Sequence, residues 1–421
     1  MSKVYKVRRY SYDQRRRGRH RIIRTIALVL VLAGLAAAGW FAYDPIYEFV
    51  TNRTNRSREE SSQSEPAPQS TSQQQSGAEA SEVFGEGTPE PGPAETLPEV
   101  TAYLPQYALT GGDLQARLAA LKNQGVQGVL FDLKGSDGKV MYSSTLESVA
   151  ANAAQTDTPY DLRQTVSAVR EAGLIPVGRI YAFKDHAATA HMYDAAVKYM
   201  DSKINWLDNS RASGGRSWLN PANEEARAYV LEIAQEAAGA GLTQIVLDGV
   251  QFPEGYALDL ATYGVQGTLN KSDILADFLR KAREKEEDWG VAFWPTINLL
   301  SASGFSEVRY GSDVGLLIEA SGRAVIEVMP EQFGNGVTGE TLTLSSPVLE
   351  PYGTVRDALA ACTEVLDVEG AEYAAVLQAY TSTTVTETMP YTSVEVAEQA
   401  RAVREFGIQR VIWYNAGGNY A

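Results

Sequence analysis

The chain has 421 residues, a formal net charge of −15 at pH 7, one cysteine and three histidines. A single cysteine excludes an internal disulfide, and His186 and His191 lack the i, i+4 spacing of a helical zinc pair, so we expect no metal and no other cofactor. The acidic balance argues against nucleic acids and anionic polymers as ligands.

The first 24 residues form a basic tail. They contain ten Lys or Arg residues against one acid, Asp13, and carry a net charge of +9. Residues 25–43 then form an uncharged run of mainly Leu, Ala and Val, long enough to cross most of a ~30 Å hydrocarbon core. We predict a single-pass transmembrane helix over 25–43, with the N-terminus cytoplasmic and the rest of the chain extracytoplasmic.

The alternative is a secretory signal peptide that is cleaved at Ala36 to Ala38. We favour an uncleaved signal anchor because the basic segment is long and the apolar run continues past these alanines. In both interpretations, the rest of the chain is exported from the cytoplasm. The basic tail then serves as a topology signal or contacts anionic lipid head groups, and we predict no nucleic-acid partner.

Residues 44–99 are rich in Ser, Gln, Glu and Pro, with few large apolar residues. Such a composition buries too little apolar surface to offset chain entropy. We therefore predict a disordered linker over 44–99.

Residues 100–421 alternate short apolar or β-branched runs with longer amphipathic segments. The eight runs are Val100 to Leu104, Val126 to Asp132, Leu174 to Tyr181, Gln244 to Asp248, Val291 to Pro295, Ala324 to Met329, Tyr373 to Gln378 and Gln409 to Tyr414. Eight repeats of strand and helix indicate parallel strands with right-handed crossovers. We predict an α/β fold, a closed (β/α)8 TIM barrel over 100–421, with an open doubly wound sheet as the alternative.

Capping and turn residues predict where several helices begin. They occur at Thr158 to Asp161, Asn220 to Asn223 and Pro351 to Thr354. The two longest excursions between strands are Asp185 to Asn223 and Phe252 to Lys271. In barrels, such insertions usually shape a cleft above the C-terminal ends of the strands.

Several predicted strands end in an acid or an amide. These residues are Asp132, Asp185, Asp248, Glu327 with Glu331, Gln378 and Asn415. In a barrel the strand ends meet at one rim, so residues far apart in the sequence come together. Each acid could instead cap a helix or pair with a basic neighbour, and only the ring as a whole favours a functional role.

Two opposed carboxylates would suit cleavage of a glycosidic bond, where one protonates the leaving oxygen and the other is the nucleophile or activates water. Asp248 is the strongest candidate. As its catalytic partner we place Glu331 and Glu327 ahead of Asp132. Glu327 lies within a predicted strand, where half of the registers point it into the barrel wall.

Aromatic residues near the same strand ends could stack on sugar rings. They are Tyr181, Trp218, Phe252, Trp294, Tyr380 and Trp413. Barrels also need bulky residues for packing, and we expect most of these six to serve that purpose.

Four motifs, in this order, resemble those of a bacterial family of membrane-anchored, glycoside-hydrolase-like proteins. They are Phe131-Asp132-Leu133-Lys134 followed by Asp137-Gly138, Gly178-Arg179-Ile180 through Phe183-Lys184-Asp185, Trp218-Leu219-Asn220-Pro221, and Leu247-Asp248-Gly249-Val250-Gln251-Phe252-Pro253. The resemblance runs from about Val100 to the C-terminus. It implies a (β/α)8 barrel in an extracytoplasmic setting that acts on a polysaccharide.

The chain also departs from the family pattern. Asn220 stands where the family tends to have an acid, Gln251 where an arginine precedes Phe-Pro, and Glu331 where an aromatic residue is usual. The run Val291 to Asn298 lacks the acid expected at that strand end. These departures keep an alternative open, in which the barrel binds glycan without cleaving it.

The sequence thus predicts a membrane-anchored glycoside hydrolase that acts on a cell-wall or extracellular polysaccharide, neutral or built from amino sugars. The alternative is an inactive carbohydrate-binding or scaffold barrel at the cell surface. The predicted catalytic residues are Asp248, Glu331 and Glu327. The predicted substrate-binding residues are Asp132, Lys134, Arg179, Lys184, Asp185, Trp218, Asn220, Gln251, Gln378, Trp413 and Asn415.

Overall fold

The computed structural model describes residues 96–265, 269–299, 313–339 and 341–420. The predicted basic tail, the predicted transmembrane helix over 25–43 and residues 44–95 of the predicted linker lie outside the described residues. Within the described residues, no helix combines the length and the apolar character needed to cross a membrane.

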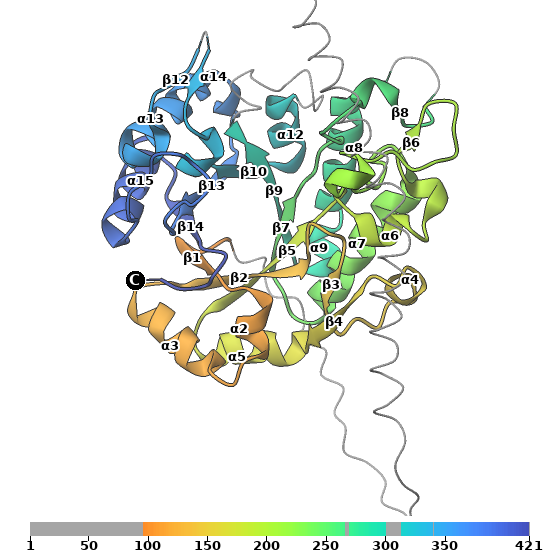
Figure 1. The fold of residues 1–421 in the computed structure, drawn as a ribbon. Helices are drawn as coiled ribbons and strands as arrows, with labels where there is room; N and C mark the ends of the chain where they lie inside the picture. The colour runs from red at the N-terminus through yellow and green to blue at the C-terminus, as the bar shows by residue number, and fades with distance from the viewer. Residues whose placement is uncertain (1–95, 266–268, 300–312, 340, 421) are drawn as a thin grey trace, which may run out of the picture. The chain divides into compact units, whose positions relative to one another are not determined.

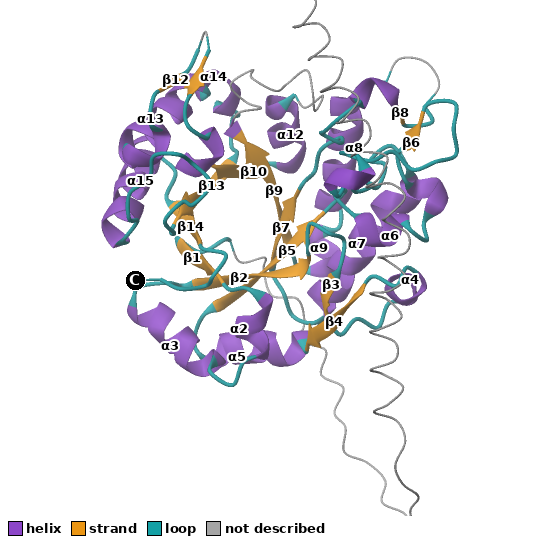
Figure 2. Cartoon of the chain, in the orientation of Figure 1, coloured by secondary structure: helices purple, strands orange, loops and turns teal. Residues whose placement is uncertain are grey.

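Eight parallel strands form a closed barrel, which Figure 2 shows as a ring of strands with helices outside it. The strands are β1 (Val100–Tyr103), β2 (Gly128–Lys134), β5 (Ile175–Tyr181), β7 (Gln244–Asp248), β9 (Ala292–Asn298), β10 (Arg323–Glu327), β13 (Glu372–Gln378) and β14 (Arg410–Tyr414). β1 pairs in parallel with both β2 and β14, and this pairing closes the sheet. The predicted barrel and all eight predicted strands are confirmed, and the open-sheet alternative is wrong.

In the ranges that the structure describes, seven longer helices lie outside the strands and around the barrel (Figure 1). They are α3 (Leu114–Asn123), α5 (Leu162–Glu171), α7 (Glu224–Gly239), α8 (Lys271–Arg283), α12 (Val314–Ser321), α13 (Pro351–Ala361) and α15 (Ser393–Glu405). The side chain of Asp161 accepts a hydrogen bond from the backbone of Gln164 and caps α5, and Asn223 caps α7 in the same way through Ala226. The predicted caps at Asp161 and Asn223 are confirmed, and α13 begins at Pro351, within the third predicted helix start.

Shorter elements fill the connections. The short helices are α2 (Gln106–Thr110), α4 (Glu147–Ala151), α6 (His186–Thr189), α9 (Glu286–Trp289) and α14 (Thr363–Leu366), and the short strands are β3 (Val140–Tyr142), β4 (Gln155–Tyr160), β6 (Lys198–Tyr199), β8 (Ala261–Thr262), β11 (Val337–Thr338) and β12 (Thr343–Leu344). Single turns of 3-10 helix lie at Tyr193–Ala195, Arg211–Ser213, Leu258–Leu260, Pro330–Phe333 and Pro347–Leu349.

β3 and β4 extend the barrel sheet after β2. β3 runs antiparallel to β2 through a turn in which Gly138 has a φ of 89°, a value that favours glycine. β4 then pairs in parallel with β3 and ends at Tyr160. The helix start predicted at Thr158 to Asp161 is therefore right only at Asp161, because pairing with β3 holds Thr158 to Tyr160 in a strand.

The two long insertions meet each other. β6, from the first insertion, pairs antiparallel with β8, from the second. Trp206 and Trp218 are fully buried beneath this small sheet and pack against Val197. The insertions therefore have their own small apolar core, which fixes their position beside the barrel.

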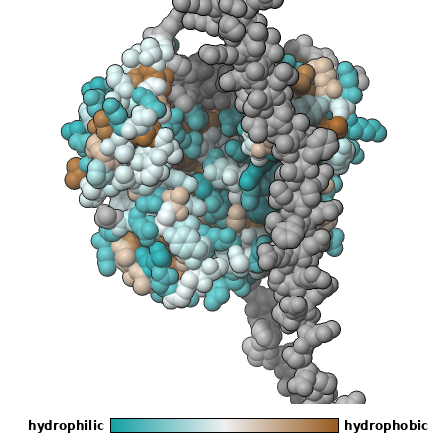
Figure 3. Space-filling model, viewed as in Figure 1, coloured by the Kyte–Doolittle hydropathy of each residue, from teal (hydrophilic) through white to brown (hydrophobic). Residues whose placement is uncertain are grey.

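The main core has two parts. Side chains inside the barrel include Leu130, Val246, Val325 and Ile412, and a larger apolar layer lies between the strands and the helices. On the face in Figure 3, the described hydrophobic residues are scattered in small, separate groups.

Candidate active site

A cavity of about 100 Å³ lies inside the barrel at the C-terminal ends of the strands. It is lined by Leu130, Arg179, Tyr181, Val246, Asp248, Thr296, Val325, Glu327, Met329, Val376, Ile412 and Tyr414. Its walls are mainly apolar, and three of its residues carry a guanidinium or carboxyl group: Arg179, Asp248 and Glu327. In barrel enzymes the active site lies at this end of the strands.

Asp248 is the last residue of β7, aligned with Tyr181 of the neighbouring β5. Its side chain is 14 % exposed, and Oδ2 lies 3.8 Å from Nη1 of Arg179. Burial raises the pKa of Asp248 because a carboxylate loses hydration inside the barrel, while the Arg179 cation opposes this rise.

Glu327 is the last residue of β10 and lines the same cavity. Burial, together with the negative charge of Asp248, raises the pKa of Glu327 to about 8. A hydrogen bond from Gln332 and the Arg179 cation act in the opposite direction. A carboxyl group with this pKa holds its proton near neutral pH and can donate it.

Arg179 connects the charged groups of the cavity. Its Nε donates to Oδ1 of Asp132 at 2.6 Å. The guanidinium lies over three tyrosine rings, 4.8 Å from the centroid of Tyr103, 5.0 Å from Tyr181 and 5.4 Å from Tyr414. These contacts hold the cation beside Asp248 in one orientation.

Asp132 is fully engaged by its neighbours. Besides the bond from Arg179, its Oδ2 accepts a hydrogen bond from the hydroxyl of Tyr103 at 2.8 Å. Tyr160 donates to its backbone carbonyl at 2.9 Å. Asp132 therefore positions Arg179, and its carboxylate has no oxygen left unbonded.

Tyr103 and Tyr414 are site residues that the sequence reasoning missed. Each is the last residue of its strand, and their rings lie 5.0 Å apart beside Arg179. The aromatic residues selected near strand ends did not include these two tyrosines, although each of them ends a predicted barrel strand or lies next to its end.

Glu331, the other predicted catalytic glutamate, lies away from this cavity. It belongs to the 3-10 turn Pro330–Phe333 after β10, and its carboxylate accepts a hydrogen bond from the hydroxyl of Thr384. Its backbone N–H donates to Oε1 of Gln378 at 2.9 Å. Glu331 thus ties the loop after β10 to the loop after β13, and Glu327 is the glutamate that lies with Asp248.

Lys134 and Asp185, both predicted to bind substrate, form an ion pair 2.9 Å long in which both side chains are 0 % exposed. Lys134 also donates to the carbonyls of Tyr181 and Ala182, and Asp185 caps α6 through the backbone of Ala188. This burial contradicts direct contact with a substrate. The pair instead holds the end of β5 and the start of the first insertion.

Trp218 is 1 % exposed, and its Nε1 donates to Oδ2 of Asp208 at 3.1 Å. A ring buried in this way has no face free for a sugar, which contradicts the predicted stacking. Lys184 lies over this ring, with Nζ 5.4 Å from the centroid, and is half-buried. The buried amide of Asn220 bonds to the backbone of Tyr263 and Ala222 and so fixes the loop.

The remaining predicted substrate-binding residues are either buried, partly buried in a loop, or on the outside of the barrel. Gln378 is 0 % exposed, and its amide bonds to the backbone of Glu331 and Tyr380. Gln251 is half-buried in the loop after β7. Trp413 and Asn415 line a separate groove outside the barrel.

Two more of the aromatic residues are packing residues. Phe252 is fully buried and packs edge-on against Tyr263. Trp294 is buried inside the barrel, where its Nε1 donates to Oε1 of Gln244 at 2.8 Å. The expectation that most of the aromatic residues fill the core is therefore confirmed for Trp218, Phe252 and Trp294.

A family model described as "putative glycosyl hydrolase domain" matches residues 101–420, which is nearly the whole barrel. The chain belongs to this family. A comparison with curated proteins finds no match.

Solved structures are similar to this glycosyl hydrolase-like domain. The glycoside hydrolase domain of PgaB (BpsB) from Bordetella bronchiseptica has a TM-score of 0.53 at 12 % identity and covers 77 % of this chain and 95 % of that one. A hypothetical protein from Ruminiclostridium thermocellum has a TM-score of 0.41 at 25 % identity and covers 46 % and 96 %. The likeness to PgaB shows the fold alone.

Proposed function

We propose that this glycosyl hydrolase-like barrel cleaves glycosidic bonds in a polysaccharide, with Glu327 as the general acid and Asp248 as the second carboxylate. The observation that carries the proposal is the placement of these two carboxyl groups in one cavity at the C-terminal end of the barrel. Pairs of carboxyl groups of which one stays protonated at neutral pH divide the acid and the nucleophile or base roles between them.

In this reaction the proton of Glu327 passes to the glycosidic oxygen as the bond between that oxygen and the anomeric carbon breaks. The carboxylate of Asp248 either bonds to the anomeric carbon or takes a proton from the water that attacks it. Arg179, 3.8 Å away, favours the ionised form of Asp248 that both routes require. In the first route, water then breaks the bond between Asp248 and the sugar and gives its proton to Glu327. In the second route, Asp248 releases the proton to solvent and Glu327 takes one up before the next cycle.

We also propose that the barrel works outside the cytoplasm, tethered by the helix predicted over 25–43 with the N-terminus inside. The basic residues 1–24 and the polar composition of 44–99 support this setting. The substrate would then be a cell-wall or extracellular polysaccharide. Protease treatment of intact cells should remove the barrel and leave the basic tail protected, and a barrel released into the medium would contradict the tether.

The test is the release of reducing ends from a panel of defined polysaccharides by the purified protein. Asp248→Asn and Glu327→Gln are each expected to lower kcat by about 10²-fold or more, since each removes one of the two required groups. Glu331→Gln is the matched control. Its fall in kcat should be at least tenfold smaller than that of the other two variants, because the Glu331 carboxylate lies outside the cavity.

Undiminished hydrolysis by Asp248→Asn would overturn the catalytic assignment. Retention of a polysaccharide on the wild-type protein, with no turnover of any member of the panel, would instead support a carbohydrate-binding barrel.

A further inference from the structure

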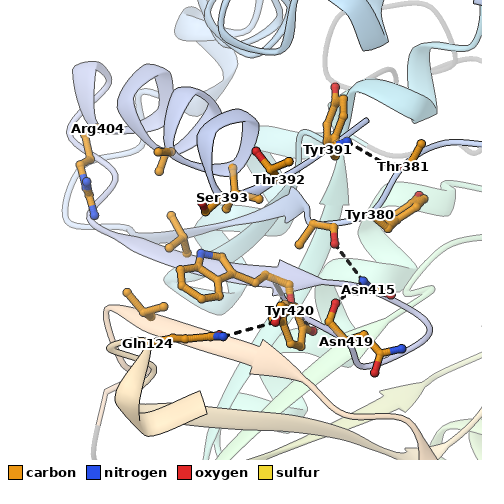
Figure 4. A pocket seen from close by; sticks show the side chains of 17 residues that line it. Gln124, Tyr380, Thr381, Tyr391, Thr392, Ser393, Arg404, Asn415, Asn419 and Tyr420 are labelled. Atoms are coloured by element: carbon orange, nitrogen blue, oxygen red, sulfur yellow. Dashed lines mark hydrogen bonds between the residues drawn. The ribbon is translucent and has the colours of Figure 1, made fainter. Parts of the chain in front are cut away.

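A second cavity, of about 550 Å³, lies outside the barrel between α15 and the C-terminal segment (Figure 4). This volume is within the range of sites that bind small molecules. In the part of the chain that the structure describes, the ring of helices is open between α15 and α3, where the C-terminus lies (Figure 1). The outer faces of β14 and β1 therefore form the floor of a groove, here called the β14 groove.

The β14 groove combines an apolar floor with aromatic and polar walls. It is lined by Val100, Gln124, Ala379, Tyr380, Thr381, Tyr391, Thr392, Ser393, Val396, Ala397, Ala400, Arg404, Val411, Trp413, Asn415, Asn419 and Tyr420. These residues include no acid, although the whole chain has a net charge of −15. Arg404 is the one fully charged side chain among them.

Several polar side chains of the groove have no partner within the described residues. Ser393, Arg404 and Asn419 form no side-chain hydrogen bond or ion pair there, and the same holds for the indole N–H of Trp413. Figure 4 shows Ser393 at the start of α15, Arg404 near its end and Asn419 on the opposite wall. The walls thus offer unused donors and acceptors on both sides of an aromatic and aliphatic floor.

The groove begins at the wall of the catalytic cavity. Tyr380 lines the groove and packs edge-on against Tyr414, which lines the cavity, with ring centroids 6.3 Å apart. From Asn415 the groove follows β14 to Val411, a length of about 13 Å at 3.3 Å per residue. A chain that leaves the cavity over Tyr380 could continue into the groove.

We propose that the β14 groove binds an uncharged stretch of the same polysaccharide, outside the catalytic cavity. This inference rests on the proposed function, because it extends the substrate from a short glycoside to a polymer. A sugar ring has apolar C–H faces and a hydroxyl edge, and amphipathic aromatic side chains flanked by amide and hydroxyl groups match both. No carboxylate faces the ligand, and the one charged side chain, Arg404, is exposed to solvent near the end of α15.

We test the groove with a substitution that fills it with a bulky side chain and leaves the hydrophobic core unchanged. Ala397 is exposed on α15 and lines the groove, so Ala397→Trp places an indole in the site. The matched control is Ala360→Trp, at an exposed position of α13 that lines neither cavity. Ala397→Trp should raise KM for the polysaccharide at least tenfold, with kcat and the turnover of a short glycoside unchanged.

A binding measurement separates the groove from the catalytic proposal. The Glu327→Gln protein should sediment with insoluble polysaccharide, and adding Ala397→Trp should reduce the bound fraction at least fivefold. Groove-dependent binding, together with no hydrolysis of any polysaccharide by the wild-type protein, would support the β14 groove and overturn the proposed hydrolysis. Equal KM and equal binding for Ala397→Trp and Ala360→Trp would overturn the groove and leave the hydrolysis standing.

A second variant guards against misfolding of the tryptophan mutant. Ser393→Ala with Asn419→Ala removes two unpaired polar groups without adding bulk, and should raise the polysaccharide KM about threefold. Thermal unfolding midpoints equal to that of the wild type establish that both variants are folded. If this double variant binds polysaccharide like the wild type, sugar recognition by the groove is overturned.

Discussion

Asp248 on β7 and Glu327 on β10 face one cavity from strands that lie on either side of β9. The negative charge of Asp248 helps to raise the pKa of Glu327 to about 8, after the larger effect of burial. Two buried carboxylates this close in space resist being ionised together. Glu327 therefore keeps its proton near neutral pH, and acid-assisted bond cleavage requires that proton.

The pH dependence of hydrolysis should reflect this pair. Because Glu327 must be protonated to act as an acid, kcat should fall as pH rises through about 8. Because Asp248 must be ionised and burial raises its pKa, the acidic limb should lie above the ordinary aspartate value of about 3.9. Initial rates from pH 4 to 10 measure both limbs.

An aryl glycoside with a good leaving group supplies the control for the basic limb. Its departure needs no proton, so Glu327→Gln should retain much more activity on it than on the polysaccharide, and the fall above pH 8 should disappear. A basic limb that persists in Glu327→Gln would assign that limb to another group.

Arg179 should act on both stability and the acidic limb. Arg179→Met leaves Asp132 and Asp248 without their cation in a site where the arginine is 8 % exposed. We expect the free energy of unfolding to fall by about 3–5 kcal/mol, since a buried charge loses its partner. Any hydrolysis that remains should show an acidic limb shifted to higher pH.

Two further variants are compared with Arg179→Met by urea denaturation. One is Arg179→Lys, and the other is the double variant Arg179→Met with Asp132→Asn. The lysine keeps the charge but loses the planar contact with the three tyrosine rings. The double variant removes the unpaired Asp132 carboxylate and should recover part of the lost stability. A single Arg179→Met as stable as the wild type would contradict the ion-pair argument.

The fold could be predicted because its signals are local. Each strand is a short apolar run, and each helix is a segment in which apolar residues recur with the helical period. Eight repeats of strand and helix therefore indicate a barrel before any contact is known. β3 and β4 escaped prediction because β3 is held by pairing with the end of β2, and β4 is held by pairing with β3. Their own sequence, including Thr158-Pro159, favours a turn ahead of a helix.

The site could be predicted in part. The sequence predicts that Asp248 lies at the rim because it ends a strand, and the structure places it there. The choice between Glu327 and Glu331 depends on which face of β10 points inward. The sequence also could not distinguish Asp132 and Arg179, which pair beside the cavity, from Lys134 and Asp185, which pair in the wall. All four lie at or near the ends of β2 and β5. Burial and pairing separate them, and both depend on the register of the β2–β5 pair.

The Lys134–Asp185 pair makes a prediction about stability alone. Asp185→Asn leaves the Lys134 ammonium 0 % exposed and without its carboxylate, so the free energy of unfolding should fall by about 3–5 kcal/mol. The matched control is Asp113→Asn, which breaks an exposed pair with Arg117 and should cost less than about 1 kcal/mol. Urea denaturation measures both. Equal effects at the two sites would show that the buried pair has no special role.

Glu236 predicts how stability depends on pH. Its carboxylate on α7 accepts hydrogen bonds from the hydroxyls of Tyr142, Ser144 and Thr145 and from the backbone N–H of Thr145, at 2.6 to 2.7 Å. Burial acts to raise the pKa of Glu236, but these hydrogen bonds outweigh it and the pKa is lowered. The ionised form is thus the one that ties the segment after β3 to α7.

Because the folded pKa lies below the unfolded value, this stabilisation is fully present above the ordinary glutamate pKa of about 4.3 and is lost as pH falls through the folded value. Glu236→Gln should therefore lower the free energy of unfolding by about 1–2 kcal/mol at pH 7, and the difference from the wild type should shrink below about pH 4. Glu225→Gln, at an exposed position on the same helix, is the control and should show no such pH dependence. A wild-type advantage that stays constant from pH 7 to pH 3 would mean that the hydrogen bonds do not depend on the charge of Glu236.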